Sequence, residues 1–366
     1  MSQLKINRPT LLLDKNKCLA NLNFMVQKAK KYNLNFRPHF KTHQSLEIGR
    51  WYKQFGINKI TVSSLQMAVY FSEDWSDITV AFPVNILEID TINFLASRIK
   101  LNILVESAES ILFLKEHLIY PVNFFMKIDS GYHRCGILHN DFDAMDNIFE
   151  AADKSEKLTF SGFLAHAGHS YKTGSYEEVI KINKDSNTKM KSLKEKYSAV
   201  FPNLILSVGD TPSMSLAENF EGIDEIRPGN FIFYDLFQHQ LGSNSMDKIA
   251  VAMCCPVVAV HKNAGEIIIY GGSVHFSKDF LIEKNGRMIF GKAVQHNHDG
   301  SWSSIIEDVY IKSLSQEHGV ISAPTDFIEK IKAGDLLTFL PVHSCLTVSS
   351  MKSYQVIGTN EIIKTL

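Results

Sequence analysis

Lys41 is the first residue of the sequence whose surroundings suggest covalent chemistry. It lies in residues 37–43, Arg-Pro-His-Phe-Lys-Thr-His, between His39 and His43 and close to Arg37. Neighbouring positive charge and burial both lower the pKa of an ammonium group, and a deprotonated lysine can form a Schiff base with a carbonyl compound. Basic clusters more often lie in solvent or bind anions, so these residues alone favour that simpler interpretation.

Arg134 is a second group that could bind a ligand. It stands in Lys-Ile-Asp-Ser-Gly-Tyr-His-Arg-Cys-Gly, residues 127–136, where an apolar run leads into a loop with two glycines. A guanidinium is a fixed fork of donors and suits a phenolate or carboxylate oxygen. A structural role, in which Arg134 caps the loop or pairs with Asp129, fits the segment equally well.

Two histidines follow another apolar run. His166 and His169 stand in Ser-Gly-Phe-Leu-Ala-His-Ala-Gly-His-Ser-Tyr, residues 161–171, and the small residues between them leave room for a planar ligand. The same spacing also suits half of a metal site or ordinary polar groups of a loop.

Two turns that contain glycine could bind phosphate. Ser-Val-Gly-Asp-Thr-Pro, residues 207–212, leads into a helix start, and Arg-Pro-Gly-Asn, residues 227–230, precedes another apolar run. Backbone N–H groups at such turns bind phosphate without needing a cation. Ordinary turn formation explains either segment alone, but the pair favours phosphate. The residues concerned are Gly209, Thr211, Gly229 and Asn230.

His343 and Cys345 pair an imidazole with a thiol near the end of the sequence. In Leu-Pro-Val-His-Ser-Cys, residues 340–345, the two side chains share one side if the segment is extended. This pair suits a borderline-soft ion such as zinc, with the remaining positions open to water or substrate. A buried cysteine beside a satisfied histidine is the commoner occurrence. Glu-His-Gly at residues 317–319 supplies further loop or outer-sphere candidates.

The composition indicates a globular protein with a small-molecule site. Of the 366 residues, 45% are hydrophobic and 21% are charged, which argues against disorder. A formal net charge of -1 gives no reason to expect a nucleic-acid or membrane partner. The five cysteines are odd in number and scattered, which argues against a disulfide framework. The charged opening of the chain does not suit a signal peptide, so we expect a cytoplasmic location.

The framework that must position these groups is predicted by alternating apolar runs and amphipathic segments. The predicted strands are about 35–40, 59–63, 78–82, 101–105, 123–129, 158–166, 204–208 and 226–234. The predicted helices are about 15–32, 43–55, 64–72, 86–97, 107–117, 141–152, 174–198 and 212–219. Strands and helices in this order predict an α/β fold, a (β/α)8 TIM-like barrel, in which functional groups follow the strand ends as they do here. A Rossmann-type sheet is the runner-up, but no Gly-x-Gly-x-x-Gly follows the first strand.

A second, mostly-β domain is expected after about residue 240. The sequence there consists of short β-branched runs separated by Gly, Asn and Asp. Residues 8–14 also look extended and would form a ninth barrel strand, so we assign them to the same domain. The expected boundaries are 15–238 for the barrel and 1–14 plus 239–366 for the β domain, which carries the metal motif.

Together the motifs resemble those of the pyridoxal-phosphate enzymes with the alanine racemase-like fold, fold type III, in the branch that contains D-serine dehydratase and D-threonine aldolase. They are Arg-Pro-His-Phe-Lys-Thr-His, Asp-Ser-Gly-Tyr-His-Arg-Cys-Gly, His-Ala-Gly-His-Ser-Tyr, Ser-Val-Gly-Asp-Thr-Pro, Glu-Ile-Arg-Pro-Gly-Asn, Gln-Glu-His-Gly and Pro-Val-His-Ser-Cys-Leu-Thr-Val. Each motif is modest by itself, but their order along nearly the whole chain is that of the family.

The resemblance implies that Lys41 forms a Schiff base with pyridoxal 5'-phosphate. Arg134 would lie near the phenolate oxygen of the cofactor and His166 against the face of its ring. Tyr171 and Arg227 are further candidates to contact the ring, and the two glycine turns would hold the phosphate. His39 and His43 are expected to tune the reactivity and position of the lysine.

The resemblance also implies that His343 and Cys345 bind a divalent metal, expected to be zinc. Family members usually have asparagine before the histidine, whereas this sequence has Val342. In the family, cysteine as the second ligand accompanies zinc and dehydration, and aspartate is commoner in bacterial aldolases. Cys345 therefore favours a D-serine dehydratase, which converts D-serine to pyruvate and ammonia.

Three other functions stay open at this stage. A D-threonine aldolase, which cleaves its substrate to glycine and an aldehyde, would use the same residues. An amino acid racemase is disfavoured because no tyrosine directly follows the glycines after Tyr270. A non-catalytic pyridoxal-phosphate-binding protein would have no use for a metal motif.

The expected chemistry assigns a role to each group. Lys41, freed by a D-3-hydroxy amino acid, would remove the α-proton as a general base. The metal on His343 and Cys345 would act as a Lewis acid on the β-hydroxyl group. We expect a small D-amino acid substrate, a homodimer, and no nucleic-acid or membrane partner.

Overall fold

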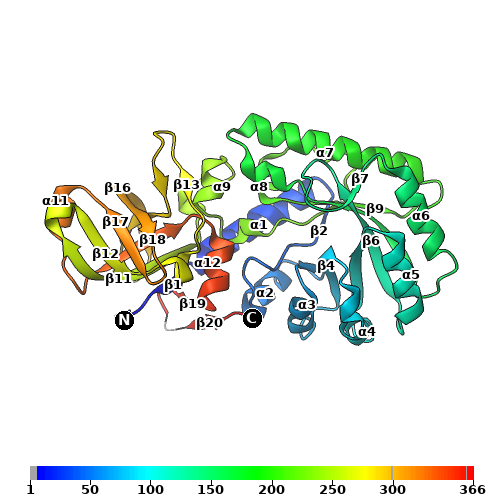
Figure 1. Cartoon of the computed structure of the whole chain (residues 1–366), viewed down its shortest axis with the longest axis horizontal. Helices are drawn as coiled ribbons and strands as arrows, with labels where there is room; N and C mark the ends of the chain where they lie inside the picture. The colour runs from blue at the N-terminus through cyan, green and yellow to red at the C-terminus, as the bar shows by residue number, and fades with distance from the viewer. Residues whose placement is uncertain (1–5, 298–299, 360) are drawn as a thin grey trace. The chain divides into compact units, whose positions relative to one another are not determined.

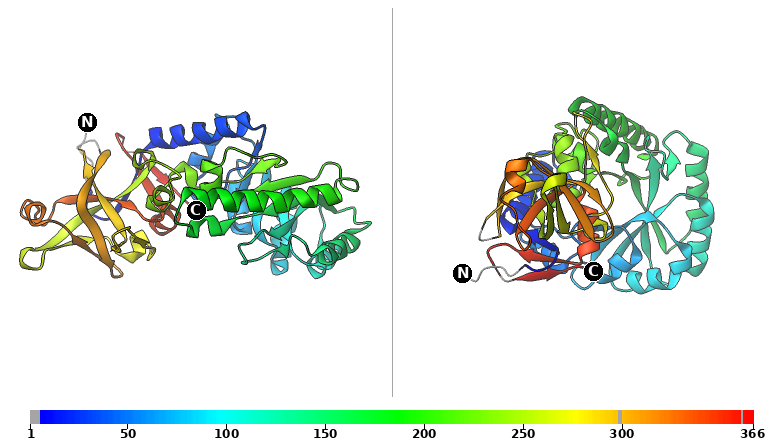
Figure 2. Two further views of the ribbon diagram at one scale, coloured as in Figure 1. Left: turned by 90° about the horizontal axis from the view of Figure 1, so that it is seen from above. Right: turned by 60° about the vertical axis from the view of Figure 1, so that its left-hand side comes forward.

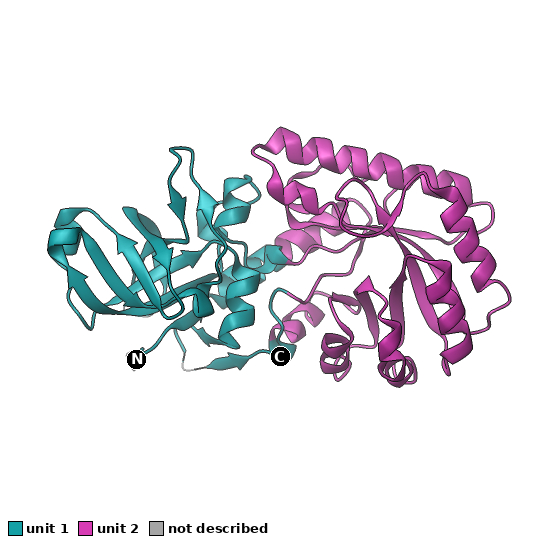
Figure 3. Cartoon of the chain, in the orientation of Figure 1, with its two compact units in different colours: residues 1–22, 42–47, 230–366 teal, residues 23–41, 48–229 magenta. Residues whose placement is uncertain are grey.

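The computed structural model describes residues 6–297, 300–359 and 361–366, and the chain divides into two compact units (Figures 1 and 3). The barrel unit comprises residues 23–41 and 48–229, and the β-rich unit comprises residues 1–22, 42–47 and 230–366.

These units do not follow the predicted domain boundaries at every point. Residues 15–22 and 230–238 cluster with the β-rich unit, although the sequence analysis expects them in the barrel. Residues 1–5 of the predicted segment 1–14 lie outside the described residues. The domain boundaries therefore stay a prediction.

The barrel unit is built on one parallel sheet. Its strands are β2 (Asn35–Phe36), β3 (Ile60–Val62), β4 (Asp77–Pro83), β5 (Lys100–Val105), β6 (Val122–Asp129), β8 (Leu158–Ala165), β9 (Ile205–Val208) and β10 (Glu225–Ile226), with β7 (Ile137–Leu138) paired to β6. The order is β2-β10-β9-β8-β6-β5-β4-β3, and a bridge between His39 and Thr61 joins the segment after β2 to β3. The predicted (β/α)8 TIM-like barrel is confirmed.

Helices cover the outside of this sheet (Figure 2). They are α1 (Lys15–Lys31), α2 (Leu46–Lys53), α3 (Leu65–Phe71), α4 (Ile89–Ala96), α5 (Ala108–His117), α6 (Phe142–Ala152), α7 (Tyr176–Tyr197) and α8 (Thr211–Leu216). Ser64, Ser107 and Ser175 start three of them by accepting a hydrogen bond from a backbone N–H of the first turn. Among the described residues, no helix is long and apolar enough to span a bilayer.

The last predicted barrel strand is much shorter than expected. The sequence predicts residues 226–234, but the strand ends at Ile226 and a 3-10 turn, Asn230–Ile232, follows. Pro228 has no N–H to donate to a ladder, which ends the pairing. The apolar run at 231–234 is buried without being a strand, so its hydrophobicity misled the prediction.

The β-rich unit contains a nine-stranded sheet. Its strands are β1 (Thr10–Leu13), β11 (Val251–His261), β12 (Glu266–Tyr270), β15 (Gly291–His296), β16 (Trp302–Leu314), β17 (His318–Ser322), β18 (Leu336–Pro341), β19 (Ser353–Val356) and β20 (Ile362–Lys364). The order is β12-β17-β16-β15-β18-β11-β1-β19-β20, and pairing of β12 with β11 closes part of it. A hairpin, β13 (Leu281–Ile282) with β14 (Met288–Ile289), and helices α9 (Leu236–Gln240), α10 (Ser273–Phe276), α11 (Thr325–Ile328) and α12 (Ser344–Met351) complete it. Residues 10–13 pair with β11 and β19 in this sheet.

Candidate active site

Lys41 follows the carboxyl end of the first barrel strand. The backbone leading to it is fixed because His39 N donates to the carbonyl of Pro228 at 2.9 Å, and Phe40 N donates to that of Thr61 at 2.8 Å. The Lys41 backbone N–H donates to Nδ1 of His39 at 3.3 Å, while the lysine side chain itself is exposed. The amine is therefore accessible on a firmly held turn.

The basic residues around Lys41 do not form the cationic cluster that the sequence suggests. Arg37 is buried, and its guanidinium is neutralised by Glu225 at 2.9 Å and Asp77 at 2.5 Å. Burial lowers the pKa of His43 to about 3, so this ring is neutral at physiological pH. For Arg37 and His43 the expectation of nearby positive charge is wrong. His39 contacts this segment through its Nδ1, which accepts the Lys41 N–H.

His166 interacts electrostatically with three other predicted cofactor residues of the barrel unit. Burial and the positive charges of Lys41, Arg134 and Arg227 together lower its pKa to about 3. A neutral imidazole has one N–H, and Nδ1 lies 2.5 Å from the carbonyl oxygen of Gly209, so Nδ1 donates there. The structure thus brings these residues within electrostatic reach of one neutral, oriented ring.

Arg134 lies in the loop after β6, next to Tyr132. Its guanidinium carbon is 5.0 Å from the centroid of the Tyr132 ring, which is a cation–π contact. Asp129 accepts instead from the N–H groups of Gly131 and His133 and from the His133 ring. The alternative in which Arg134 pairs with Asp129 is therefore not what the structure contains.

His169, the second histidine of the 161–171 motif, also lies against Tyr132. The two rings are stacked at 6.2 Å between centroids, and Nδ1 of His169 is buried without a hydrogen-bond partner among the described residues. Gly168 is one of the small residues predicted to make room for a ligand, but the residue that occupies this room is Tyr132. A Cβ at position 168 would come within 2.5 Å of the Tyr132 ring.

The turn before α8 has the properties of an anion site. Asp210 caps the helix by accepting from Ser213 N at 2.8 Å, and Thr211 N donates to the hydroxyl of Tyr171 at 3.0 Å. The hydroxyl oxygens of Thr211 and Ser213 are buried and have no hydrogen-bond partner among the described residues. Buried donors without acceptors are costly, and phosphate oxygens would supply the acceptors. These residues fit the phosphate of the predicted cofactor.

Arg227 is held in one orientation by the barrel. Its Nη1 donates to Ser207 Oγ at 2.6 Å and its Nη2 to the carbonyl of Ala165 at 2.7 Å. Burial lowers the pKa of Arg227 to about 10, which leaves it charged at neutral pH. A Cβ at Gly209 would lie 2.9 Å from the Arg227 backbone, so only glycine fits there. Gly229 is buried in the same turn and is the last barrel residue before the chain enters the β-rich unit.

His343 and Cys345 come together, although not through an extended segment. His343 is the N-cap of α12 and has an extended backbone, but Cys345 lies in the first turn of that helix, so the extended conformation assumed for 340–345 is wrong from Ser344 onward. Nδ1 of His343 lies 2.6 Å from the Asp279 carboxylate. Burial opposes charge on this ring, but hydrogen bonds with Asp279 and Cys345 outweigh it and raise the pKa of His343 to about 11.

This arrangement fits a metal with two protein ligands. A carboxylate on Nδ1 is the usual way to orient a metal-binding histidine, and it leaves Nε2 for the ion. The described ranges contain no group of three His, Cys, Asp or Glu side chains arranged around one ion, so water or substrate would complete the coordination. Asp279 gives no sequence signal, because it lies far from His343 along the chain and in no motif.

Asn230 lies with the metal motif. Its Nδ2 is 2.7 Å from Asp235 Oδ2, 3.0 Å from Ser344 Oγ and 3.4 Å from Cys345 Sγ. Thr42, directly after Lys41, also reaches the sulfur, with Oγ1 3.3 Å from it. The predicted phosphate role of Asn230 therefore rests on its backbone alone, and Thr42 is a residue that the sequence analysis missed.

Lys127 was also missed, although the sequence contains a signal for it. It is a charged residue inside the apolar strand β6, and its side chain is 5% exposed. Burial, helped by the positive charges of Arg227 and Arg134, lowers the pKa of Lys127 to about 8. The barrel interior next to the site thus contains an amine that loses its proton easily.

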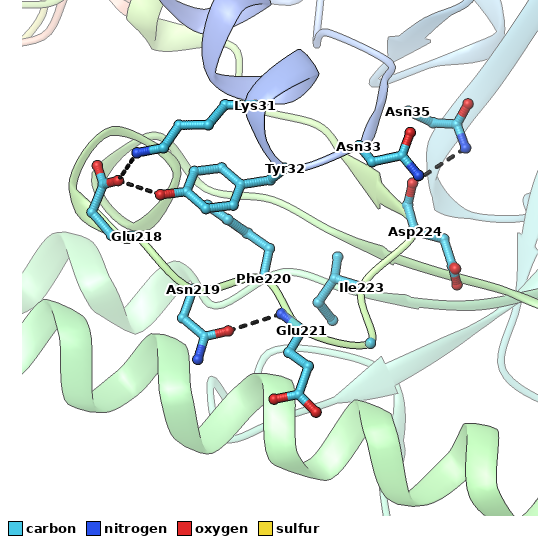
Figure 4. Close-up of a pocket in the computed structure, with 11 residues that line it drawn as sticks. Lys31, Tyr32, Asn33, Asn35, Glu218, Asn219, Phe220, Glu221, Ile223 and Asp224 are labelled. Atoms are coloured by element: carbon cyan, nitrogen blue, oxygen red, sulfur yellow. Dashed lines mark hydrogen bonds and ion pairs between the residues drawn. The ribbon is translucent and has the colours of Figure 1, made fainter.

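A polar hollow of about 730 Å³ lies at the other end of the barrel strands (Figure 4). It is lined by the end of α1 and by the segment before β10, and Figure 4 shows Lys31 and Tyr32 both directed to Glu218. Barrels of this kind place their chemistry at the carboxyl ends of the strands. Because Asn35 and Asp224 mark the amino ends, this hollow is not the candidate site.

Comparison with known proteins identifies the family. Residues 13–236 match the family model described as alanine racemase, N-terminal domain, and residues 250–357 match a putative serine dehydratase domain. The first model covers more than half of the chain, so this chain belongs to the alanine racemase N-terminal domain family of pyridoxal-phosphate enzymes. The predicted resemblance is confirmed.

Within this family, relatives along the full length are lyases. The chain is 29% identical to D-serine dehydratase of Dictyostelium discoideum, over 98% of this chain and 96% of the relative. It is 24% identical to D-threo-3-hydroxyaspartate dehydratase of Delftia sp. (strain HT23), over 99% and 97%. These relatives indicate that the chain is itself a lyase.

Solved structures agree on the fold. The D-threo-3-hydroxyaspartate dehydratase from Delftia sp. HT23 superposes with a TM-score of 0.91 at 23% identity, covering 100% of this chain and 99% of the other. D-threonine aldolase from Filomicrobium marinum has a TM-score of 0.82 at 16% identity, covering 100% and 98%.

Proposed function

We propose that this chain is a pyridoxal-phosphate- and divalent-metal-dependent lyase of D-3-hydroxy amino acids, and a D-serine dehydratase in particular. The observation that carries the proposal is the meeting of His343 with Cys345, with Asp279 fixing the imidazole. Relatives named D-serine dehydratase support the substrate. A cysteine-to-alanine variant of D-threo-3-hydroxyaspartate dehydratase has been solved in a metal-free form, which supports the metal.

Bound pyridoxal phosphate would supply an electron-poor ring that stabilises negative charge at the substrate Cα, and a bound divalent ion would supply Lewis acidity toward the β-hydroxyl. Lys41 would hold the cofactor covalently, and its amine is the base that would take the α-proton of the substrate. His166 is a buried, neutral imidazole, so it would lie against the cofactor ring without adding charge. Arg134 would donate to the phenolate oxygen of the cofactor.

The phosphate would be held by the hydroxyl groups of Thr211 and Ser213, which have no hydrogen-bond partner among the described residues. The backbone of Gly209 and Gly229 would lie alongside them. Tyr171 fixes the turn by accepting the Thr211 N–H.

The chain itself ties the lysine to the metal motif. Thr42 is joined to Lys41 by a peptide bond, and its Oγ1 lies 3.3 Å from the sulfur of Cys345. This continuity of the chain supports a function in which Lys41 and the metal motif serve the same reaction.

An aldolase is the second candidate function. The chain is 26% identical to 3-hydroxy-D-aspartate aldolase of Paracoccus denitrificans over 64% of its length. Such an enzyme would remove the proton of the β-hydroxyl and break the Cα–Cβ bond instead. Cys345 favours dehydration. Zinc as the metal, a homodimer and a cytoplasmic location also stay proposals.

Product analysis of the metal-loaded enzyme tests the function. We expect pyruvate and ammonia from D-serine, oxaloacetate and ammonia from D-threo-3-hydroxyaspartate if that is the substrate, and glycine with acetaldehyde from D-threonine if the enzyme is an aldolase. Chelation and Cys345→Ala should each remove at least about 99% of turnover, because the loss of one transition-state charge contact costs several kcal/mol. Zinc should restore the chelated enzyme only.

Lys41→Ala separates cofactor binding from catalysis in the same experiment. It should abolish the visible absorbance of the lysine-bound cofactor, whereas Lys181→Ala, at an exposed position of α7, should not. An unchanged cofactor spectrum in Lys41→Ala would refute the cofactor assignment, and turnover that survives chelation would refute the metal assignment.

A further inference from the structure

The sulfur of Cys345 has two hydrogen-bonding neighbours besides His343. Oγ1 of Thr42 lies 3.3 Å away and Nδ2 of Asn230 lies 3.4 Å away. Thr42 is fully buried and Asn230 is 6% exposed, so neither group exchanges freely with water. Both distances are within the range of hydrogen bonds to sulfur. All these residues belong to the β-rich unit, so the cluster is internal to it.

The orientation of Asn230 is fixed by a carboxylate. Oδ2 of Asp235 accepts from Nδ2 of Asn230 at 2.7 Å, from Ser344 N at 3.0 Å and from Ser344 Oγ at 3.2 Å. An amide turned the other way would place its oxygen against this carboxylate, so the nitrogen must face Asp235 and Cys345. Oδ1 of Asn230 is left buried, without a hydrogen-bond partner among the described residues. A metal-bound water is the kind of donor that would satisfy it.

Thr42 is fixed through the residue that follows it. The carbonyl of His43 accepts from the buried hydroxyl of Tyr354 at 2.7 Å, and Nδ1 of His43 accepts from Ser45 N at 3.2 Å. His43 is fully buried, so the backbone after Thr42 cannot turn without breaking these bonds. The Thr42 hydroxyl is thus held beside the sulfur by the fold.

The positions of Thr42 and Asn230 in the sequence suggest a role for both residues. Thr42 follows Lys41, the proposed cofactor anchor, and Asn230 follows Gly229 of the proposed phosphate turn. Each stretch that would hold the cofactor therefore continues, one residue later, into a hydrogen bond with the metal-ligand sulfur.

We propose that Thr42 and Asn230 are positioning residues that orient the sulfur of Cys345 for the metal, and that through Thr42 metal binding is coupled to cofactor attachment at Lys41. This inference rests on the proposed function, which makes Cys345 a metal ligand. Donors outside the coordination sphere fix the direction of ligand lone pairs, and their loss typically weakens metal binding 10- to 100-fold. Coupling of two bound ligands is reciprocal, so the cofactor and the metal should each strengthen the binding of the other.

Thr42→Val tests the positioning role, because valine keeps the shape of threonine and removes its hydroxyl. We expect zinc to bind the full-length variant about 10- to 100-fold more weakly than the wild type, measured by competition with a coloured chelator. Thr42→Ser, which keeps the hydroxyl, should bind like the wild type. Thr338→Val is the matched control, since Thr338 is equally buried in the β-rich unit but bonds His296. With Co²⁺, the thiolate-to-metal absorption band should shift in Thr42→Val only.

The same titrations on protein with and without pyridoxal phosphate test the coupling. In the wild type the cofactor should strengthen zinc binding by at least about 5-fold. In Thr42→Val the two zinc affinities should be nearly equal. Should that variant not fold, Thr42→Ala takes its place, and unfolding curves establish that each variant tested is native.

The outcomes separate this inference from the proposed function. Equal zinc affinity and an unshifted Co²⁺ band in Thr42→Val, with Cys345-dependent binding in the wild type, would overturn the inference and leave the function standing. Zinc binding that does not depend on Cys345 would overturn the proposed metal site, and the inference with it.

Discussion

At the scale of single residues, two histidines show how neighbours decide charge. His166 sits beside the cationic groups of Lys41 and Arg227, and burial together with these charges lowers its pKa to about 3. His343 sits between the Asp279 carboxylate and the Cys345 sulfur, which raise its pKa to about 11. The first ring therefore stays neutral among cationic neighbours, and the second is oriented by a carboxylate on Nδ1.

Lys127 is the residue for which pH dependence gives the clearest prediction. Burial lowers its pKa from 10.5 to about 8. Between about pH 8 and 10.5 the unfolded chain therefore carries a proton that the folded chain lacks, and stability rises with pH through this window. Below pH 8 both states are protonated, and the cost of burying the charge, on the order of 3 kcal/mol, is fully present.

Lys127→Met removes this cost and keeps the side-chain volume. Urea unfolding of the cofactor-free protein should show the variant more stable than the wild type at pH 7, with the difference shrinking as the pH approaches 10. Met190→Leu, a buried change in α7 that involves no titrating group, should shift stability by the same amount at both values of pH. A difference between Lys127→Met and wild type that is independent of pH would show that Lys127 is not buried as a charge at neutral pH.

At the scale of elements, an ionic network supports the weakest part of the barrel. β2 and β10 are two residues long each, and one bridge joins the segment after β2 to β3. Arg37, the residue directly after β2, pairs with Glu225 on β10 and with Asp77 on β4. Short ladders have few backbone hydrogen bonds, so these buried side-chain bonds link strands that the backbone links poorly.

Arg37→Met should therefore destabilise the protein by about 3–5 kcal/mol, because it leaves two carboxylates buried near each other without their cation. Lys100→Met is the control, since Lys100 pairs with the same Asp77 from an exposed position at 3.4 Å and should contribute less than about 1 kcal/mol. Chemical unfolding of both variants measures the difference. Equal losses of unfolding free energy in Arg37→Met and Lys100→Met would mean that the buried ion pairs of Arg37 do not link these short strands.

Local signals predicted the elements well, and contacts between distant segments explain the misses. Serine caps and apolar periodicity place α3, α5 and α7 within one or two residues of the prediction, because these forces act within one helix. The apolar run at 231–234 is buried by packing against other segments and forms no strand. Its composition alone cannot distinguish this kind of burial from that of a strand in a sheet. Likewise, no local pattern predicts that Asp279 would orient His343, or that Arg37 would be neutralised by two carboxylates far along the chain.

At the scale of the whole molecule, the β-rich unit is assembled from three separate stretches of the chain. Residues 42–47 are the shortest of them, and they follow directly on Lys41. Tyr354, in β19, donates its buried hydroxyl to the carbonyl of His43 at 2.7 Å across 311 residues of sequence. A site on a discontinuous unit thus depends on bonds that form only when the late part of the chain has folded.

Tyr354→Phe isolates this long-range bond. It should leave the His43 carbonyl buried without that donor, lower the free energy of unfolding by about 1–3 kcal/mol, and speed hydrogen exchange of the amides in 42–47. Tyr197→Phe removes a comparable hydroxyl, which bonds Asp146 at 2.7 Å in the barrel unit, and should destabilise without changing exchange in 42–47. Hydrogen exchange with mass spectrometry measures both. If the two variants exchange alike in 42–47, the segment is held by its own turn, and the late part of the chain does not control the backbone beside Lys41.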